Sequence, residues 1–170
     1  SHYRICVTRR PASLAGADDA LAAGAPRFMD ALGLWSQPGV FSWDRIDPGS
    51  VLLAARLPRF EGAGADLGCG IGYLSLHVLQ STAVKRLDLV DVDRRAIAAA
   101  RRNVKDPRAH LHWADASSGD ARFGKLDFVV MNPPFHSAGI EDKALGQAFI
   151  RSAAQMLRPA GVCWLVANRH

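Results

Sequence analysis

The sequence predicts an α/β fold in which a doubly wound, mostly parallel sheet carries helices on both faces. From residue 63 onward, predicted strands and helices alternate with short links, as a parallel sheet requires. The segment 126–131 (LDFVVM) is apolar apart from one aspartate, which is typical of a strand buried on both faces. With 170 residues, the chain is long enough for one domain with a substantial core.

The composition excludes several classes of protein. Apolar residues make up 49% of the chain and charged residues 22%, which is ordinary for a globular domain and excludes intrinsic disorder. No apolar run approaches the roughly 18 residues of a membrane-spanning helix, and the first residues do not resemble a signal peptide. Cys6, Cys69 and Cys163 are far apart and form no CxxC pair. We therefore expect neither a disulfide framework nor a metal site, and a cytoplasmic location.

The N-terminal third gives weaker patterns. Residues 3–9 alternate between polar and apolar, which predicts a short strand, and the Ala-, Gly- and Pro-rich segment that follows predicts a helix over 18–23 or over 27–34. Residues 37–50 contain two Pro-Gly turns and are predicted to form a structured loop. A helix over 51–57 is expected next, started by Asp47-Pro48.

The regular part of the chain supplies the predicted sheet and its helices. The strands are expected at 63–68, 86–92, 109–114, 126–131 and 162–167, with helices over 73–81, 94–104 and 142–157. Asp93 is a suitable N-cap for the helix 94–104. Pro159 and Gly161 are expected to end the last helix before the final strand begins.

Ligands of such sheets bind at the carboxyl ends of the strands, and a glycine cluster stands at the first of these ends. Gly68, Gly70 and Gly72 let the backbone approach a ligand closely. The spacing is not GxGxxG, since residue 73 is Tyr, and no Gly-Lys-Ser/Thr follows. This departure argues against a nicotinamide or nucleoside triphosphate site. A tight turn without a ligand is the alternative interpretation.

Polar residues follow three further strands. Asp91 comes about 20 residues after the glycine loop, where a carboxylate can accept both hydroxyls of a ribose. Asp115 follows the next strand and, taken alone, fits an exposed turn equally well. Asn132, Pro133, Pro134 and Phe135 follow the buried strand; the prolines fix the backbone and remove donors, which leaves carbonyl acceptors beside an amide and an aromatic ring.

Taken together, DLGCGIG, the acidic Asp91 and NPPF resemble the class I S-adenosylmethionine (SAM)-dependent methyltransferases. NPPF is similar to the Asn/Asp-Pro-Pro-Phe/Tyr motif of enzymes that methylate planar exocyclic nitrogens. The segment PGVFSWDRIDPGS resembles the "methyltransferase small" domain, and NPPFH with the later VAN resembles the bacterial ribosomal RNA guanine-N2 methyltransferases of that group. The resemblance covers residues 38–168.

The resemblance implies a Rossmann-like sheet, SAM as cofactor and a role for each motif residue. The residues expected to bind the cofactor are Asp66, Gly68, Gly70, Gly72, Asp91, Val92, Asp115, Ala116 and Asn132. Asn132 and the Pro133 carbonyl are expected to hold the target amine, and Phe135 to stack on its base. Phe41, Ser42 and Ser50 are expected to cover the cofactor.

The resemblance also divides the chain. Residues 38–170 are expected to form the methyltransferase domain, C-terminally truncated because the hairpin strands that close the family's sheet have no counterpart here. Residues 1–37 are expected to be an N-terminal extension, the remnant of an upstream domain.

RNA is the expected partner. The net charge is +5, and 17 Arg stand against 4 Lys, which suits phosphate binding. A GC-rich genome would also explain the Arg excess together with the 28 Ala. Three functions remain open: methylation of guanine N2 in ribosomal RNA, N-methylation of adenine or protein glutamine, and a non-catalytic module that binds SAM or RNA.

Overall fold

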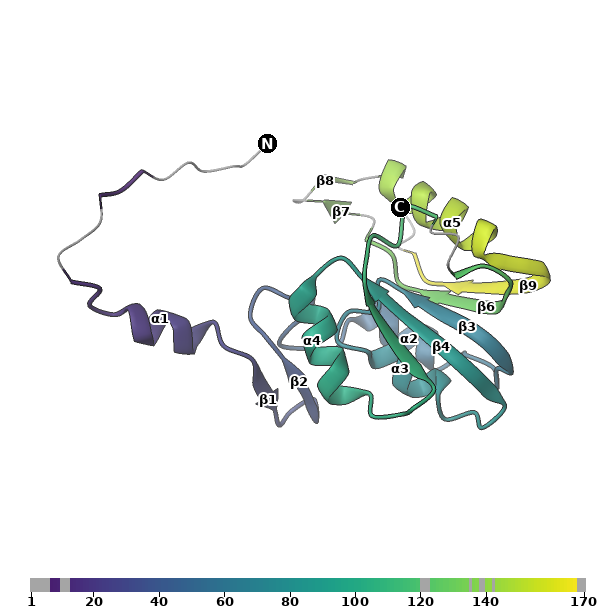
Figure 1. Cartoon of the computed structure of the whole chain (residues 1–170), viewed down its shortest axis with the longest axis horizontal. Helices are drawn as coiled ribbons and strands as arrows, with labels where there is room; N and C mark the ends of the chain where they lie inside the picture. The colour runs from purple at the N-terminus through teal and green to yellow at the C-terminus, as the bar shows by residue number, and fades with distance from the viewer. Residues whose placement is uncertain are drawn as a thin grey trace.

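The computed structural model describes residues 7–9, 13–119, 123–134, 136–137, 140–141 and 143–167. A five-stranded parallel sheet forms its centre (Figure 1). In spatial order, the strands are β5 (Ala109–Trp113), β4 (Val84–Asp91), β3 (Gly62–Leu67), β6 (Leu126–Met131) and β9 (Leu157–Leu165). The predicted doubly wound α/β fold is therefore confirmed.

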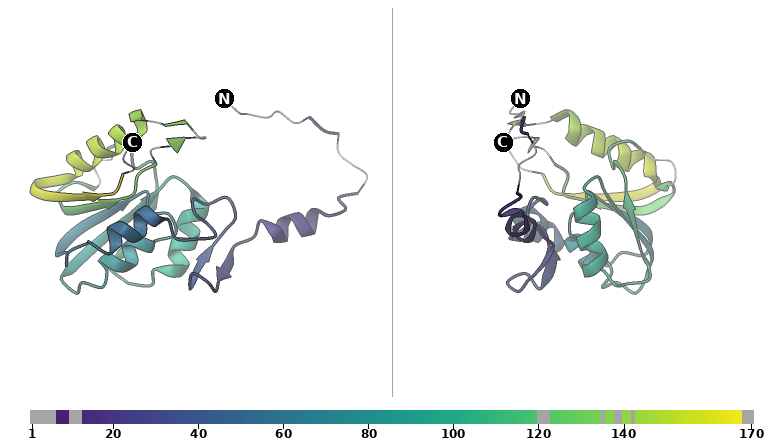
Figure 2. Two further views of the ribbon diagram at one scale, coloured as in Figure 1. Left: turned by 180° about the vertical axis from the view of Figure 1, so that it is seen from behind. Right: turned by 60° about the vertical axis from the view of Figure 1, so that its left-hand side comes forward.

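Helices cover both faces of this sheet (Figure 2). On one face lie α2 (Pro48–Ala54), α3 (Tyr73–Val78) and α4 (Arg94–Asn103), whose apolar side chains share a core cluster with the sheet. On the other face lies α5 (Lys143–Met156), whose apolar side chains join a second cluster. Because both faces are covered, the central strands are buried almost along their whole length.

The strand order reverses between β3 and β6. The chain first moves outward from β3 through β4 to β5 and then returns to the other side of β3. The register is level at the carboxyl ends, since Leu67 lies opposite both Val90 and Met131. The residues that follow these three strands are therefore neighbours at a topological switch point.

The N-terminal part departs from the prediction at residues 27–34, and α2 begins and ends three residues earlier than the predicted helix 51–57. Helix α1 (Ala17–Ala23) confirms the first alternative, but residues 27–34 are not helical. They contribute to an antiparallel hairpin of β1 (Arg27–Met29) and β2 (Leu34–Ser36). Tertiary contact decides this, because the Asn103 amide of α4 pairs with both the N–H and the carbonyl of Trp35, at 2.7 and 2.9 Å.

Two other predictions need comment. Of the predicted strand 3–9, only 7–9 lie within the described residues, and they are irregular and exposed. The last strand begins earlier than expected, at Leu157, so Pro159 and Gly161 lie within β9. A shift in register against β6 accommodates them, and among the described residues β9 pairs with no other strand that would require the missing N–H of proline. A short hairpin, β7 (His136–Ser137) with β8 (Ile140–Glu141), precedes α5.

Candidate functional site

A cavity of about 500 Å³ lies at the carboxyl ends of β3, β4 and β6. Its walls come from seven segments of the sequence. The lining residues are Val40, Phe41, Asp47, Pro48, Gly49, Gly68, Gly70, Asp91, Val92, Asp93, Ala96, Asp115, Ala116, Asn132, Pro133, Pro134, Leu145, Phe149, Val166 and Ala167. The volume falls within the range of roughly 300–1,000 Å³ that is usual for small-molecule sites.

The glycine loop presents its backbone to this cavity. Gly68 and Gly70 have backbone φ angles of 72° and 53°, which residues with a side chain rarely adopt. A Cβ on Gly70 would meet no heavy atom within 4 Å. The third glycine, Gly72, has a structural role outside the cavity. Gly72 does not line the cavity, and a Cβ there would lie 2.8 Å from the Val104 side chain. Gly72 therefore allows α3 to approach α4 closely, while the first two glycines face the cavity.

Asp91 is fixed by backbone donors. One carboxylate oxygen accepts the N–H of Gly70 and the other accepts the N–H of Asp93, both at 2.8 Å. Burial raises the pKa of the Asp91 carboxyl, and these backbone hydrogen bonds work against the increase. Each carboxylate oxygen can accept a further hydrogen bond from a ligand in the cavity.

Asp66 lies beneath the glycine loop and not on the cavity wall. Its side chain is fully buried, and one carboxylate oxygen accepts the Ser75 hydroxyl at 2.6 Å. Burial raises the pKa of this carboxyl to about 7, and the nearby charge of Asp91 adds to the increase. Asp66 thus supports the site from behind, in contrast to the direct contact that the resemblance implies.

The third wall follows β4 and β5. Val92 is exposed, and its carbonyl accepts the indole N–H of Trp113 at 2.8 Å. Asp115 also lines the cavity, and its Oδ1 accepts both the N–H and the hydroxyl of Ser117. Ala116 is buried beside it. The structure therefore brings Val92, Asp115 and Ala116 to the same cavity as the glycine loop.

Asn132 and Pro133 form the fourth wall, at the end of β6. The Asn132 amide nitrogen donates to the Asp47 carboxylate at 2.8 Å and to the Ser50 hydroxyl at 2.9 Å. A carboxylate has only acceptors, so this contact settles which end of the amide is nitrogen. Phe135, the predicted stacking residue, lies outside the described residues.

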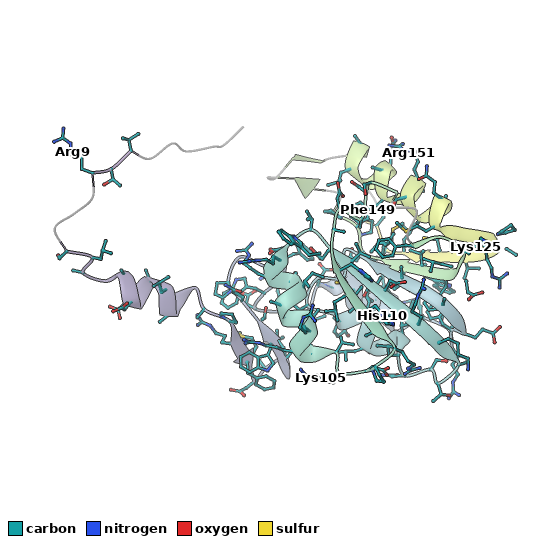
Figure 3. The ribbon with its side chains drawn as sticks, in the orientation of Figure 1. Arg9, Lys105, His110, Lys125, Phe149 and Arg151 are labelled. Carbon is teal, nitrogen blue, oxygen red and sulfur yellow. The ribbon has the colours of Figure 1, made fainter. Side chains whose placement is uncertain are left out.

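Several lining residues were not among the predicted site residues. Asp47 was expected only to start a helix, and it does cap α2 by accepting the N–H of Ser50 at 2.9 Å. Leu145 and Phe149 belong to the apolar stripe of α5, on which Figure 3 labels Phe149. A Cβ on Gly68 would lie 3.5 Å from the Phe149 ring. Helical periodicity identifies such a stripe as core and gives no sign that its first turns border a cavity.

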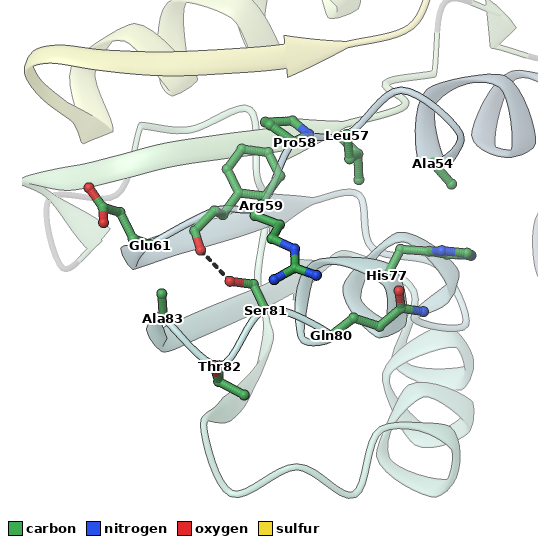
Figure 4. Close-up of a pocket in the computed structure, with 11 residues that line it drawn as sticks. Ala54, Leu57, Pro58, Arg59, Glu61, His77, Gln80, Ser81, Thr82 and Ala83 are labelled. Carbon is green, nitrogen blue, oxygen red and sulfur yellow. Dashed lines mark hydrogen bonds between the residues drawn. The ribbon is translucent and has the colours of Figure 1, made fainter.

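A second cavity, of about 480 Å³, lies at the opposite end of the sheet (Figure 4). It is lined by the segments that precede β3 and β4 and by parts of α2 and α3, and the Ser81 hydroxyl donates to the Phe60 carbonyl there at 2.6 Å. Sheets of this kind bind ligands at the carboxyl ends of their strands, which favours the first cavity as the functional site.

Within the described part of the chain, no three His, Cys, Asp or Glu side chains are grouped so that they could hold a metal ion. Among the same residues, no helix is long and apolar enough to span a membrane.

The sequence profile of the methyltransferase small domain matches residues 31–170. The chain belongs to this family. A ribosomal RNA small subunit methyltransferase C from Hahella chejuensis is 33% identical over 143 residues, which is 83% of this chain and 42% of the relative. A ribosomal RNA large subunit methyltransferase G from Shewanella amazonensis is 34% identical over 166 residues, or 88% and 43% of the two chains.

A solved structure extends the comparison. It is the Thermus thermophilus 16S rRNA N2 G1207 methyltransferase, in complex with AdoMet and guanosine. That protein is 32% identical, with a TM-score of 0.66 over 85% of this chain and 41% of its own. The chain thus spans about two fifths of the length of these relatives.

Proposed function

We propose that this protein transfers a methyl group from SAM to the N2 amine of guanine in ribosomal RNA. The observation that carries the proposal is the meeting of Gly70, Asp91 and Asn132 at one cavity. Membership of the methyltransferase small domain family supports it, as does similarity to an enzyme whose structure holds AdoMet and guanosine.

Chemical complementarity assigns the cofactor to the glycine-loop side of the cavity. The backbone at Gly68 and Gly70 is open to the methionine part of SAM, and the Asp91 carboxylate can accept the two ribose hydroxyls. The exposed Val92 side chain offers an apolar surface to the adenine, with Asp115 and Ala116 at its edge. Asp66 and Gly72 act indirectly, by supporting the loop.

The target amine belongs on the Asn132 side. An exocyclic amine is planar because its lone pair is delocalised into the base. Two acceptors, Asn132 Oδ1 and the Pro133 carbonyl, can bind its hydrogens and favour the pyramidal nitrogen that attack requires. A bound SAM would supply the methyl group: the amine lone pair would form the new N–C bond as the methyl carbon's bond to sulfur breaks, and sulfur would keep that electron pair as a neutral thioether. The cationic nitrogen would then pass its proton to water. The enzyme contributes mainly by positioning.

The stacking role of Phe135 and the domain division at residues 37 and 38 remain part of this proposal. Stacking of a flipped base on an aromatic ring would compensate for its removal from the RNA helix. Methylation of adenine or protein glutamine would use the same acceptors. The names of both curated relatives favour ribosomal RNA and differ in the ribosomal subunit.

The deciding experiment incubates the chain with methyl-labelled SAM and separate pools of small-subunit RNA, large-subunit RNA, DNA and protein. Nucleoside mass spectrometry should find N2-methylguanosine in one RNA pool. N6-methyladenosine or methylglutamine would redirect the substrate assignment. SAM binding without transfer to any pool would favour the non-catalytic module.

A further inference from the structure

We infer that Asp47 is a positioning residue that holds the Asn132 amide in its reactive orientation. This inference rests on the proposed function and adds a residue that no sequence motif assigned to the chemistry. Asp47 and Asn132 are 85 positions apart, yet their side chains form a hydrogen bond of 2.8 Å at the wall of the cavity.

The hydrogen-bond inventory of Asn132 gives the first argument. Its amide nitrogen has two N–H donors, and one faces Asp47 Oδ2 while the other faces the Ser50 hydroxyl. Both donors are therefore used within the protein. The amide oxygen must point away from Asp47, which keeps it available as an acceptor for a substrate amine.

The carboxylate is itself held in place. Asp47 Oδ2 also accepts the Ser50 N–H at 2.9 Å, so the side chain is anchored at the start of α2. Gly49 leaves room for it, because a Cβ at that position would lie 2.9 Å from Asp47 Oδ2. The acceptor that faces Asn132 therefore belongs to a fixed framework and not to a freely rotating side chain.

The acceptor character of Asp47 Oδ2, to which the Ser50 N–H and the Asn132 amide both donate, gives the second argument. If the Asn132 amide turned over, its oxygen would face the carboxylate and the two acceptors would repel each other. A neutral hydroxyl alone would not impose this choice, since it can donate as well as accept. Asp47 thus selects one of two amide orientations, while Ser50 completes the pair of acceptors.

Asp47 also caps α2, so the test must separate the two roles. Asp47→Ser keeps a good N-cap but places its oxygen one bond short of the Asn132 amide. Asp47→Asn keeps an oxygen that can cap α2 and accept from Asn132. Leu52→Gly is the control for a weakened α2, because Leu52 is half-exposed on that helix and lies outside the cavity wall.

The measurements are single-turnover methyl transfer to whichever ribosomal RNA pool the parent methylates, SAM affinity by calorimetry, and hydrogen exchange of the Asn132 side-chain amide by NMR. We expect Asp47→Ser to lower the transfer rate by about 10- to 100-fold, the scale of a misplaced reacting group, with SAM affinity within about twofold. Its Asn132 amide should exchange faster. Asp47→Asn should recover most of the rate, and Leu52→Gly should match the parent.

Three results would overturn the inference. An unchanged transfer rate in Asp47→Ser would leave Asp47 as a helix cap only. A loss of SAM affinity as large as the loss of rate would make it a cofactor ligand. Unchanged exchange of the Asn132 amide would show that Asp47 does not hold it. If the parent methylates nothing, the proposed function fails, and the amide exchange alone decides whether Asp47 positions Asn132.

Discussion

The two sides of the cavity are built in different ways. On the glycine-loop side, Asp91 is held by backbone N–H groups, and its partners lie no more than 21 positions away in the sequence. On the Asn132 side, the amide is held by side chains 82 and 85 positions away. Backbone donors survive substitution of the residues that carry them, whereas side-chain partners do not. The Asn132 side should therefore be the more sensitive to single substitutions.

The largest expected effect tests the Asn132 side directly. In the proposed mechanism, the hydrogen bond that Asn132 accepts from the target amine strengthens as the amine becomes pyramidal. Asn132→Ala removes this acceptor, so kcat and kcat/KM should fall together by about 10²–10³. SAM affinity should stay within a few-fold. Single-turnover transfer at saturating SAM checks the first expectation and calorimetry the second. Transfer at the parental rate would refute the exocyclic-amine mechanism.

The next effect concerns the pH dependence of the protein's stability, which the buried Asp66 beneath the glycine loop influences. The pKa of Asp66 is raised from its ordinary value of 3.8 to about 7, so between these pH values the folded protein binds more protons than the unfolded chain. Stability should therefore fall as the pH rises from about 4 to 7, by up to a few kcal/mol. Burial raises the pKa of Asp91 as well, which adds to the same trend.

Asp66→Asn should flatten this dependence, because the amide cannot ionise. Urea unfolding at several pH values would measure it. Asp18→Asn, on the exposed α1, is the matched control and should retain the parental profile. Parallel profiles for parent and Asp66→Asn would show that the buried carboxyl does not titrate in this range.

A smaller loss is expected on the glycine-loop side. Asp91→Ala should weaken SAM binding by about 1.5–3 kcal/mol, the usual range for hydrogen bonds to a charged group. Calorimetry measures the SAM affinity. Asp106→Ala is the control, because it removes the same charge at a position beyond the C-terminal end of α4. Equal affinities for Asp91→Ala and the parent would remove Asp91 from the ribose site.

The smallest effect concerns RNA association and the basic face of α4. Arg94 and Arg101 are exposed, whereas Arg95 pairs with Asp93 and Arg102 stacks on Trp35. If RNA phosphates contact this face, RNA binding should weaken as the salt concentration rises. A plot of the logarithm of the binding constant against the logarithm of the salt concentration should then gain a negative slope of about 0.7 for each single-strand phosphate contacted. The double variant Arg94→Gln/Arg101→Gln removes two such contacts and should reduce the slope by about 1.4, as titrations at several salt concentrations would measure. An unchanged slope would place the RNA elsewhere.

From residue 63 onward, local patterns in the sequence determined the helices, the first four strands of the sheet and the four segments that follow those strands. Alternating apolar residues, the Asp93 cap and the glycine cluster act within a few residues of the chain. The level ends of parallel strands then bring Gly68, Asp91 and Asn132 together, which fold class alone predicts. The residues predicted to bind the cofactor line the cavity, apart from Asp66 and Gly72, which lie behind the glycine loop; their roles toward a cofactor stay predictions.

Only the tertiary structure decided the features that depend on contacts between distant segments. The hairpin of β1 and β2 replaces one predicted helix because Asn103 pairs with Trp35. Strand β9 can include Pro159 because, within the described part of the chain, it pairs with β6 alone. The sequence likewise does not indicate that Asp47 is the hydrogen-bond partner of Asn132. A hydrogen bond across 85 positions leaves no periodicity or spacing, so Asp47 could be assigned to Asn132 only after the chain had brought them together.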